Sequence, residues 1–175
     1  MTSNANGYSL VELMITVAVL GLAAGITLPN LNRNWDDERL NSTTKIMSSW
    51  LDDVRRRAIQ TSEPCGISLN ADTATLAATA DNTCGSFDAL ALRDLIPSNK
   101  PLQITASENS PTSWWFTPRG TLAFNAANSD AQHISFRLTI SGNTQQGRCL
   151  KVTAPLALLR SGKLRSGTCV YTSAF

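Results

Sequence analysis

The stretch from Tyr8 to Leu28 reads YSLVELMITVAVLGLAAGITL and contains one charged residue, Glu12. As an α-helix these 21 residues would be about 32 Å long, which matches the hydrocarbon thickness of a bilayer. We therefore expect residues 8–29 to form a transmembrane helix or the core helix of a filament. A cleaved secretory signal peptide fits poorly, because Met1 to Gly7 contains no Lys or Arg and the apolar stretch is long.

Glu12 is an unusual residue for such a helix. A carboxylate in apolar surroundings is costly, and intramembrane acids therefore usually have a partner and a role. The next cation along the chain is Arg33, and no nearer residue can neutralise the acid. The partner is expected to come from another molecule or from a chain terminus. Cleavage between Gly7 and Tyr8 would create such a cation, the new amine of a neighbouring subunit.

The segment Gly7-Tyr8-Ser9-Leu10-Val11-Glu12-Leu13-Met14 resembles the cleavage and methylation motif of the type IV pilin superfamily. The resemblance implies that residues 1–7 are a leader peptide, that a prepilin peptidase cuts after Gly7, and that Tyr8 is N-methylated. It also implies that Glu12 pairs with the N-terminal amine of a neighbour during assembly. Pro29 has the spacing of the family's helix-disrupting proline, which implies a kink there. Tyr8 stands where the family usually has phenylalanine.

The resemblance also implies a location and a set of partners. The chain would be a single-pass protein of the inner membrane before assembly, and then part of an extracytoplasmic filament in the periplasm or at the cell surface. Its partners would be other pilins or pseudopilins, the prepilin peptidase and an inner-membrane assembly platform. The leader lacks basic residues and Arg33 and Arg39 follow the span, so the orientation follows from the resemblance and not from the charges.

After Pro29 the pattern becomes amphipathic. Met47, Trp50, Leu51, Val54 and Ala58 recur at spacings of three and four residues, which predicts one helix face against a core. We expect an amphipathic helix over residues 30–61, ending before Pro64.

Residues 64–175 predict a β-rich globular head. Two hairpins are expected, one around Asn70-Ala71-Asp72 and one around Pro118-Arg119-Gly120. Ile134 to Ile140 alternates apolar and polar residues, which predicts a half-buried strand with Ser135, Arg137 and Thr139 facing outward. Ala89 to Ile96 fits a short helix or a loop. The expected fold class is α+β, with a long N-terminal helix packed on an antiparallel sheet.

The four cysteines fall into two pairs along the sequence, Cys65 with Cys84 and Cys149 with Cys169. Each pair would close a loop of about 20 residues, and two disulfides in an oxidising compartment would contribute about 3 kcal/mol each. Four free thiols in a cytosolic domain are the alternative. No CxxC spacing occurs and His133 has no cysteine near it in sequence, so no metal site is expected.

Three segments of the head resemble the GspH/FimU/FimT type of minor pilins and pseudopilins. They are Arg57-Ala58-Ile59, Trp115-Phe116-Thr117-Pro118-Arg119-Gly120-Thr121, and Leu159-Arg160-Ser161-Gly162-Lys163-Leu164-Arg165. Gly162-Lys163-Leu164-Arg165 is also similar to the GRxR-like motif of the DNA-binding FimT-type pilins, with Lys163 in place of arginine.

Charge is distributed unevenly along the chain. Residues 131–175 contain six Lys or Arg and no Asp or Glu, so this segment carries a charge of +6. Because the net charge of the whole chain is +2, the preceding residues together carry −4. We group five of these cations as the basic strip: Arg148, Lys151, Arg160, Lys163 and Arg165. Lys163 and Arg165 are expected to project to the same side of a turn held by a Cys149–Cys169 bridge. The strip could dock acidic faces of neighbouring pilins or bind DNA phosphates.

No catalytic constellation or cofactor motif is recognisable, so we expect neither an enzyme nor a cofactor. The single His133 is expected to be structural or exposed on the surface. Trp114 and Trp115 could stack on bases, but core packing is the commoner role of such aromatic residues. The sequence thus favours a minor pilin or pseudopilin that is built into, or primes, a type IV pilus or a type II secretion pseudopilus near its tip. A DNA-binding minor pilin and a simple anchored periplasmic binding protein are the alternatives.

Overall fold

A computed structural model describes residues 9–106, 110–124, 131–140 and 146–171, without the side chains of residues 25–33 and 146. The chain forms two compact units, residues 1–36 and residues 37–175. The boundary between them lies within a single helix, α1 (Leu10–Thr61).

The first unit contains the N-terminal part of α1. Its backbone is helical through Pro29, where the sequence predicts a kink, but the side chain of Pro29 lies outside the described part of the chain. Large apolar side chains, among them Leu10, Met14 and Leu22, are exposed along this segment. Across the described residues, no helix combines the length and apolar character needed to cross a membrane. The predicted span, residues 8–29, includes residue 8 and five side chains (25–29) that are not described.

The second unit is the head, and it begins with the remainder of α1. The expected apolar face of the helix is confirmed: Met47, Leu51, Val54 and Ala58 are buried, and Leu40 joins them. Trp50 packs at the edge of this core against Phe87. The helix ends at Thr61, because Ser62 has a φ of 57°, in the left-handed region where helices commonly stop, and Pro64 follows.

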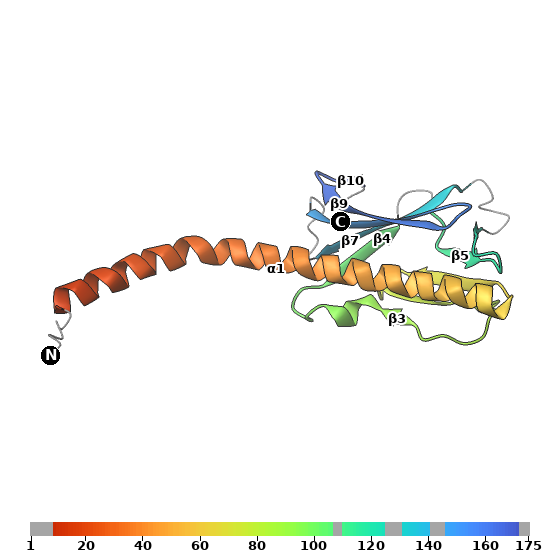
Figure 1. Cartoon of the computed structure of the whole chain (residues 1–175), viewed down its shortest axis with the longest axis horizontal. Helices are drawn as coiled ribbons and strands as arrows, with labels where there is room; N and C mark the ends of the chain where they lie inside the picture. The colour runs from red at the N-terminus through yellow and green to blue at the C-terminus, as the bar shows by residue number, and fades with distance from the viewer. Residues whose placement is uncertain (1–8, 107–109, 125–130, 141–145, 172–175) are drawn as a thin grey trace, which may run out of the picture. The chain divides into compact units, whose positions relative to one another are not determined.

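The described strands form two antiparallel sheets of five strands each (Figure 1). Sheet A has the order β3-β2-β1-β5-β6, and sheet B has the order β10-β9-β8-β7-β4. The strands of sheet A are β1 (Cys65–Asn70), β2 (Thr75–Ala78), β3 (Leu90–Ala91), β5 (Ser113–Phe116) and β6 (Leu122–Ala123). Those of sheet B are β4 (Leu102–Ala106), β7 (His133–Ile140), β8 (Gln146–Thr153), β9 (Leu158–Arg165) and β10 (Thr168–Val170). The α+β fold class is confirmed.

Both predicted hairpins are present. β1 pairs with β2 around the turn after Asn70, and β5 pairs with β6 around Gly120. The segment Ala89 to Ile96, which the sequence left undecided, is the short strand β3 followed by a 3-10 helix, η1 (Leu92–Leu95).

The two sheets and α1 share one core. Trp114 on β5 meets Phe136 on β7, with ring centroids 5.5 Å apart, and both side chains are fully buried. These two rings join sheet A to sheet B at the centre of the head.

The prediction of a half-buried β7 is wrong for two of its three outward positions. Arg137 is exposed, but Ser135 and Thr139 are each only 8% exposed. The Ser135 side chain is within hydrogen-bonding reach of the Tyr171 hydroxyl, and its backbone N–H donates to Ser110 Oγ over 3.2 Å. The chain segments that cover this face come from distant parts of the sequence, so the alternation alone could not reveal them.

Candidate functional site

The residues expected to direct processing and assembly lie at the N-terminal end of the chain. Gly7 and Tyr8 fall outside the described residues, so the predicted cleavage and N-methylation sites have no described geometry. Glu12 lies in the first turn of α1, and it is exposed. An acid in this position interacts favourably with the positive end of the helix dipole. Within the described part of the chain, Glu12 forms no ion pair.

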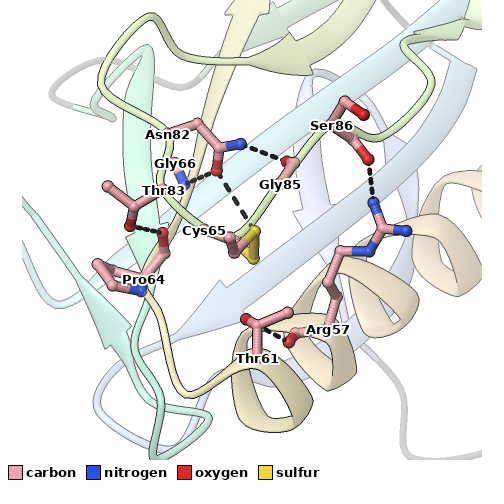
Figure 2. The surroundings of a disulfide bond; sticks show 10 residues. Arg57, Thr61, Pro64, Cys65, Gly66, Asn82, Thr83, Gly85 and Ser86 are labelled. Carbon is pink, nitrogen blue, oxygen red and sulfur yellow. Dashed lines mark hydrogen bonds between the residues drawn. A yellow bond between two sulfur atoms is a disulfide. The ribbon is translucent and has the colours of Figure 1, made fainter.

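The first disulfide, Cys65–Cys84, lies where α1 leads into β1, with a Cα–Cα distance of 5.1 Å. Figure 2 shows the hydrogen bonds around it. The Asn82 side chain accepts from the backbone N–H of Gly66 and donates to the carbonyl of Gly85 over 2.7 Å. On the helix side, Arg57 donates to the carbonyl of Ser86. The bridge and these bonds hold the loop after β2 against the end of α1.

The second disulfide, Cys149–Cys169, joins β8 to β10 across the intervening strand β9, with a Cα–Cα distance of 6.0 Å. Gly162 on β9 is paired with Cys149. A Cβ at Gly162 would come within 2.6 Å of the Val170 carbonyl oxygen, so only glycine leaves room for the backbone that follows Cys169. Both disulfides expected from the cysteine spacing are therefore formed.

Lys163 and Arg165 lie in strand β9 and not in a turn as expected. The turn that follows is Ser166-Gly167, with φ values of 50° and 78°, the conformation of a two-residue hairpin turn. Since residues two apart on a strand point to the same face, Lys163 and Arg165 still share a side of the sheet. Cys149–Cys169 holds the strands that flank them.

The basic strip is divided between the two faces of sheet B. In the register, Lys151 lies opposite Arg160, and Arg148 lies opposite Lys163. Because alternate residues point to opposite faces, these two pairs lie on opposite sides of the sheet. Arg148 and Lys163 lie on the side of α1, and Lys151 and Arg160 lie on the outer side.

Asp37 on α1 binds the pair on the inner side. Its Oδ1 accepts from Arg148 Nε over 3.2 Å and its Oδ2 accepts from Arg148 Nη2 over 3.0 Å, while Lys163 Nζ lies 3.6 Å from Oδ2. The Arg148 side chain is 14% exposed, so this two-point contact is partly shielded from water and stronger than a surface pair. The Asp37 side chain is 49% exposed, so the contact lies at the edge of the head. No local sequence signal links Asp37 to Arg148, 111 positions away.

The outer face of sheet B carries a different set of cations, the outer basic face: Arg137, Lys151 and Arg160. Lys151 Nζ lies 5.9 Å from the centre of the Tyr171 ring, a cation–π distance. Arg137 on β7 is paired with Cys149 on β8, two residues along that strand from Lys151. It is not one of the five residues of the basic strip. Arg137 is an exposed residue within a strand that is otherwise buried from Ile134 to Ile140, and this exposure marks it as part of the outer basic face.

Two titratable residues border the outer basic face. Burial lowers the pKa of His133, and the charge of Lys151 lowers this pKa further. Burial raises the pKa of the Tyr171 hydroxyl. Both side chains are therefore uncharged at neutral pH, and the charge of this face comes from its Lys and Arg residues.

Neither Trp114 nor Trp115 presents an open platform on which a base could stack. Trp114 is in the core, and Trp115 is half-buried over Gly66, where an added Cβ would lie 2.8 Å from the indole Nε1. In the described parts of the chain, no three His, Cys, Asp or Glu side chains gather into a group that could hold a metal ion.

Comparisons with known proteins agree with this organisation. Residues 2–28 match the family model of the prokaryotic N-terminal methylation motif. Two crystal structures of the type IV minor pilin FimU from Pseudomonas aeruginosa each have a TM-score of 0.51 with this chain. In one, 15% of residues are identical and the alignment covers 74% of this chain and 96% of FimU; in the other the values are 16%, 79% and 95%.

The minor pseudopilin EpsH from the type 2 secretion system of Vibrio cholerae has a TM-score of 0.47, with 14% identity over 72% of this chain and 95% of EpsH. No curated protein matches the chain. The chain thus carries the N-terminal methylation motif, and its fold is that of the type IV minor pilin FimU.

Proposed function

We propose that this chain, with its N-terminal methylation motif and its FimU-like fold, is a minor pilin or pseudopilin that is assembled into an extracytoplasmic filament. The supporting observation is that both features occur in one chain: the motif covers residues 2–28, and the FimU alignment covers 74% of the chain. A helix that ends in a disulfide-linked head suits a subunit whose helix packs in a filament and whose head faces solvent. The filament would be a type IV pilus or a type II secretion pseudopilus.

The proposed pathway has three steps. The precursor is held in the inner membrane by residues 8–29. A prepilin peptidase then removes residues 1–7, and Tyr8 is N-methylated. Finally Glu12, exposed at the start of α1, pairs with the new amine of a neighbouring subunit on the assembly platform. The subunit would take a position at or near the filament tip, where it would start assembly.

Cleavage after Gly7 can be tested by blocking it. Gly7→Ala is expected to leave a precursor that retains residues 1–7, because the peptidase recognises the glycine before the cut. Mass spectrometry of the purified protein would distinguish the uncut form from the mature, methylated form beginning at Tyr8. A mature N-terminus in a strain without prepilin peptidase would contradict the proposal and would favour a simple anchored periplasmic binding protein.

DNA capture is a second candidate function, and the outer basic face favours it. Arg137, Lys151 and Arg160 lie on neighbouring strands on the same face of sheet B, and residues 131–175 contain no acid to oppose them. Phosphate contacts of this kind give binding that weakens steeply with salt. The alternative role of the same face is to dock an acidic surface of a neighbouring subunit.

A titration of the full chain in detergent micelles with duplex DNA, at two salt concentrations, tests this candidate. Lys151→Ala/Arg160→Ala is expected to weaken binding and to reduce the slope of log K against log salt by about 2. Lys163→Ala/Arg165→Ala is the matched pair, and it should have a smaller effect because Lys163 already contacts Asp37. Absence of binding near physiological salt would leave the outer basic face as a docking surface.

A further inference from the structure

A groove of about 320 Å³ lies between α1 and sheet B in the head. Its lining consists of Asn41, Thr44, Lys45, Ser48 and Ser49 from α1, Arg148 from β8 and Ser161 from β9. The helix residues 41, 44, 45 and 48 follow the spacing of a single helix face. A face that merely packed on the sheet would be apolar. This one places the Asn41 amide, the Lys45 ammonium and the Ser48 hydroxyl beside a hollow large enough for a ligand. The Thr44 hydroxyl is already bonded to the Leu40 carbonyl.

The charge of the groove favours an anion. Among the described residues that line it, Lys45 and Arg148 are cations and none is a carboxylate. Asp37 takes two of the five N–H groups of Arg148, so three remain. Lys163 also contacts Asp37, so Arg148, Lys163 and Lys45 together exceed the one acid by two charges. Lys45 is exposed and contacts no described acid.

The length of the groove indicates the form of the ligand. From Asn41 to Ser49 the helix rises about 12 Å. An extended peptide covers this distance with three or four residues, at about 3.3 Å per residue. Hydroxyl groups from both walls can donate to, or accept from, a peptide backbone, while the cations bind a carboxylate.

We propose that this groove binds an acidic peptide segment, with Lys45 and Arg148 holding an Asp or Glu side chain of a neighbouring filament subunit. The identity of the partner rests on the proposed function, since a filament brings such segments close at high local concentration. The preference of the groove for an acidic peptide does not rest on the proposed function, because the groove and its charges are features of the head alone.

Fluorescence anisotropy with a labelled peptide, Gly-Glu-Ser-Glu-Ser-Gly, tests the proposal on the full chain in detergent micelles. The twin peptide with glutamine in place of each glutamate is expected to bind at least about 10-fold more weakly, because it lacks the charge-assisted contacts. Lys45→Glu should weaken binding of the acidic peptide by about 10-fold or more. Ser48→Tyr, which narrows the groove and keeps its charge, should also abolish binding.

Arg119→Glu is the matched control, because Arg119 is exposed in the β5–β6 turn and away from the groove lining. It should change the affinity less than about 2-fold, apart from the salt-screened effect of net charge. Equal binding of the two peptides, an unchanged affinity in Lys45→Glu, or an equal loss in Arg119→Glu would each overturn the proposal. So would free glutamate competing as well as the peptide, since the site would then take a small acid. A negative result here leaves assembly through Glu12 untouched, and that role is measured separately by incorporation into filaments.

Discussion

Replacing Glu12 with alanine is expected to leave membrane insertion intact and to lower incorporation into filaments by at least about 100-fold. Insertion should survive because the change removes the only charge of the apolar stretch from Tyr8 to Leu28. Incorporation should fail because a neighbour's N-terminal amine would lose its anionic partner. Two unit charges 4 Å apart interact by about 4 kcal/mol at an effective dielectric constant of about 20. Even half of this energy would shift subunit association more than about 10-fold, and an unpaired buried amine adds its own penalty.

Incorporation can be measured by immunoblotting sheared filaments and the membrane fraction of a host that carries the cognate assembly machinery. Val11→Ala is a matched control, because Val11 is also an exposed residue of the first turns of α1. It should be incorporated normally. Glu12→Gln separates charge from size and should fail like Glu12→Ala. Normal incorporation of either Glu12 variant would contradict the assembly role.

The second large effect is expected in the core of the head. Trp114→Ala should destabilise the head by about 3–5 kcal/mol, the cost of removing a buried aromatic side chain and leaving a cavity. Trp114 is fully buried and contacts Phe136 across the two sheets, so its loss weakens the junction between them. Chemical denaturation of the full chain in detergent, followed by near-UV circular dichroism, would report this loss.

Trp114→Phe is the informative control. The indole Nε1 of Trp114 is buried without an acceptor among the described residues, so phenylalanine removes an unsatisfied donor while keeping an aromatic ring. We expect a cost below about 1.5 kcal/mol. Trp115→Ala should also cost less than Trp114→Ala, since Trp115 is half-buried on the other side of the strand. Equal losses at positions 114 and 115 would show that the two sheets are not joined through Trp114.

The division of the basic strip changes how its cations can act. Arg148 and Lys163 lie at Asp37, where they fix the start of the head's helix to sheet B. The cations of the outer basic face do not contact Asp37, and this face is the surface proposed for DNA; it includes Arg137, which lies outside the sequence-chosen strip. A variant that removes Lys163 alone would report on the Asp37 contact as much as on any external ligand.

Local features of the sequence determined a large part of this protein. The segment from Gly7 to Met14 indicated the methylation motif, which the family match to residues 2–28 confirms. The apolar spacing of Met47, Leu51, Val54 and Ala58 gave the buried helix face, because a helix repeats every three to four residues. Turn residues placed the two hairpins, and the spacing of the cysteines gave both disulfides.

Only the tertiary structure decided which charged and polar groups meet. Asp37 reaches Arg148 because α1 lies along sheet B and the register of β8 with β9 places Lys163 beside it. The same register sends Lys151 and Arg160 to the opposite face. Ser135, which the alternation of β7 placed in solvent, is only 8% exposed, and its backbone N–H donates to Ser110 Oγ from a distant segment. Periodicity within a strand shows which residues share a face, but the pairing of distant segments decides what covers that face, and no local pattern encodes that pairing.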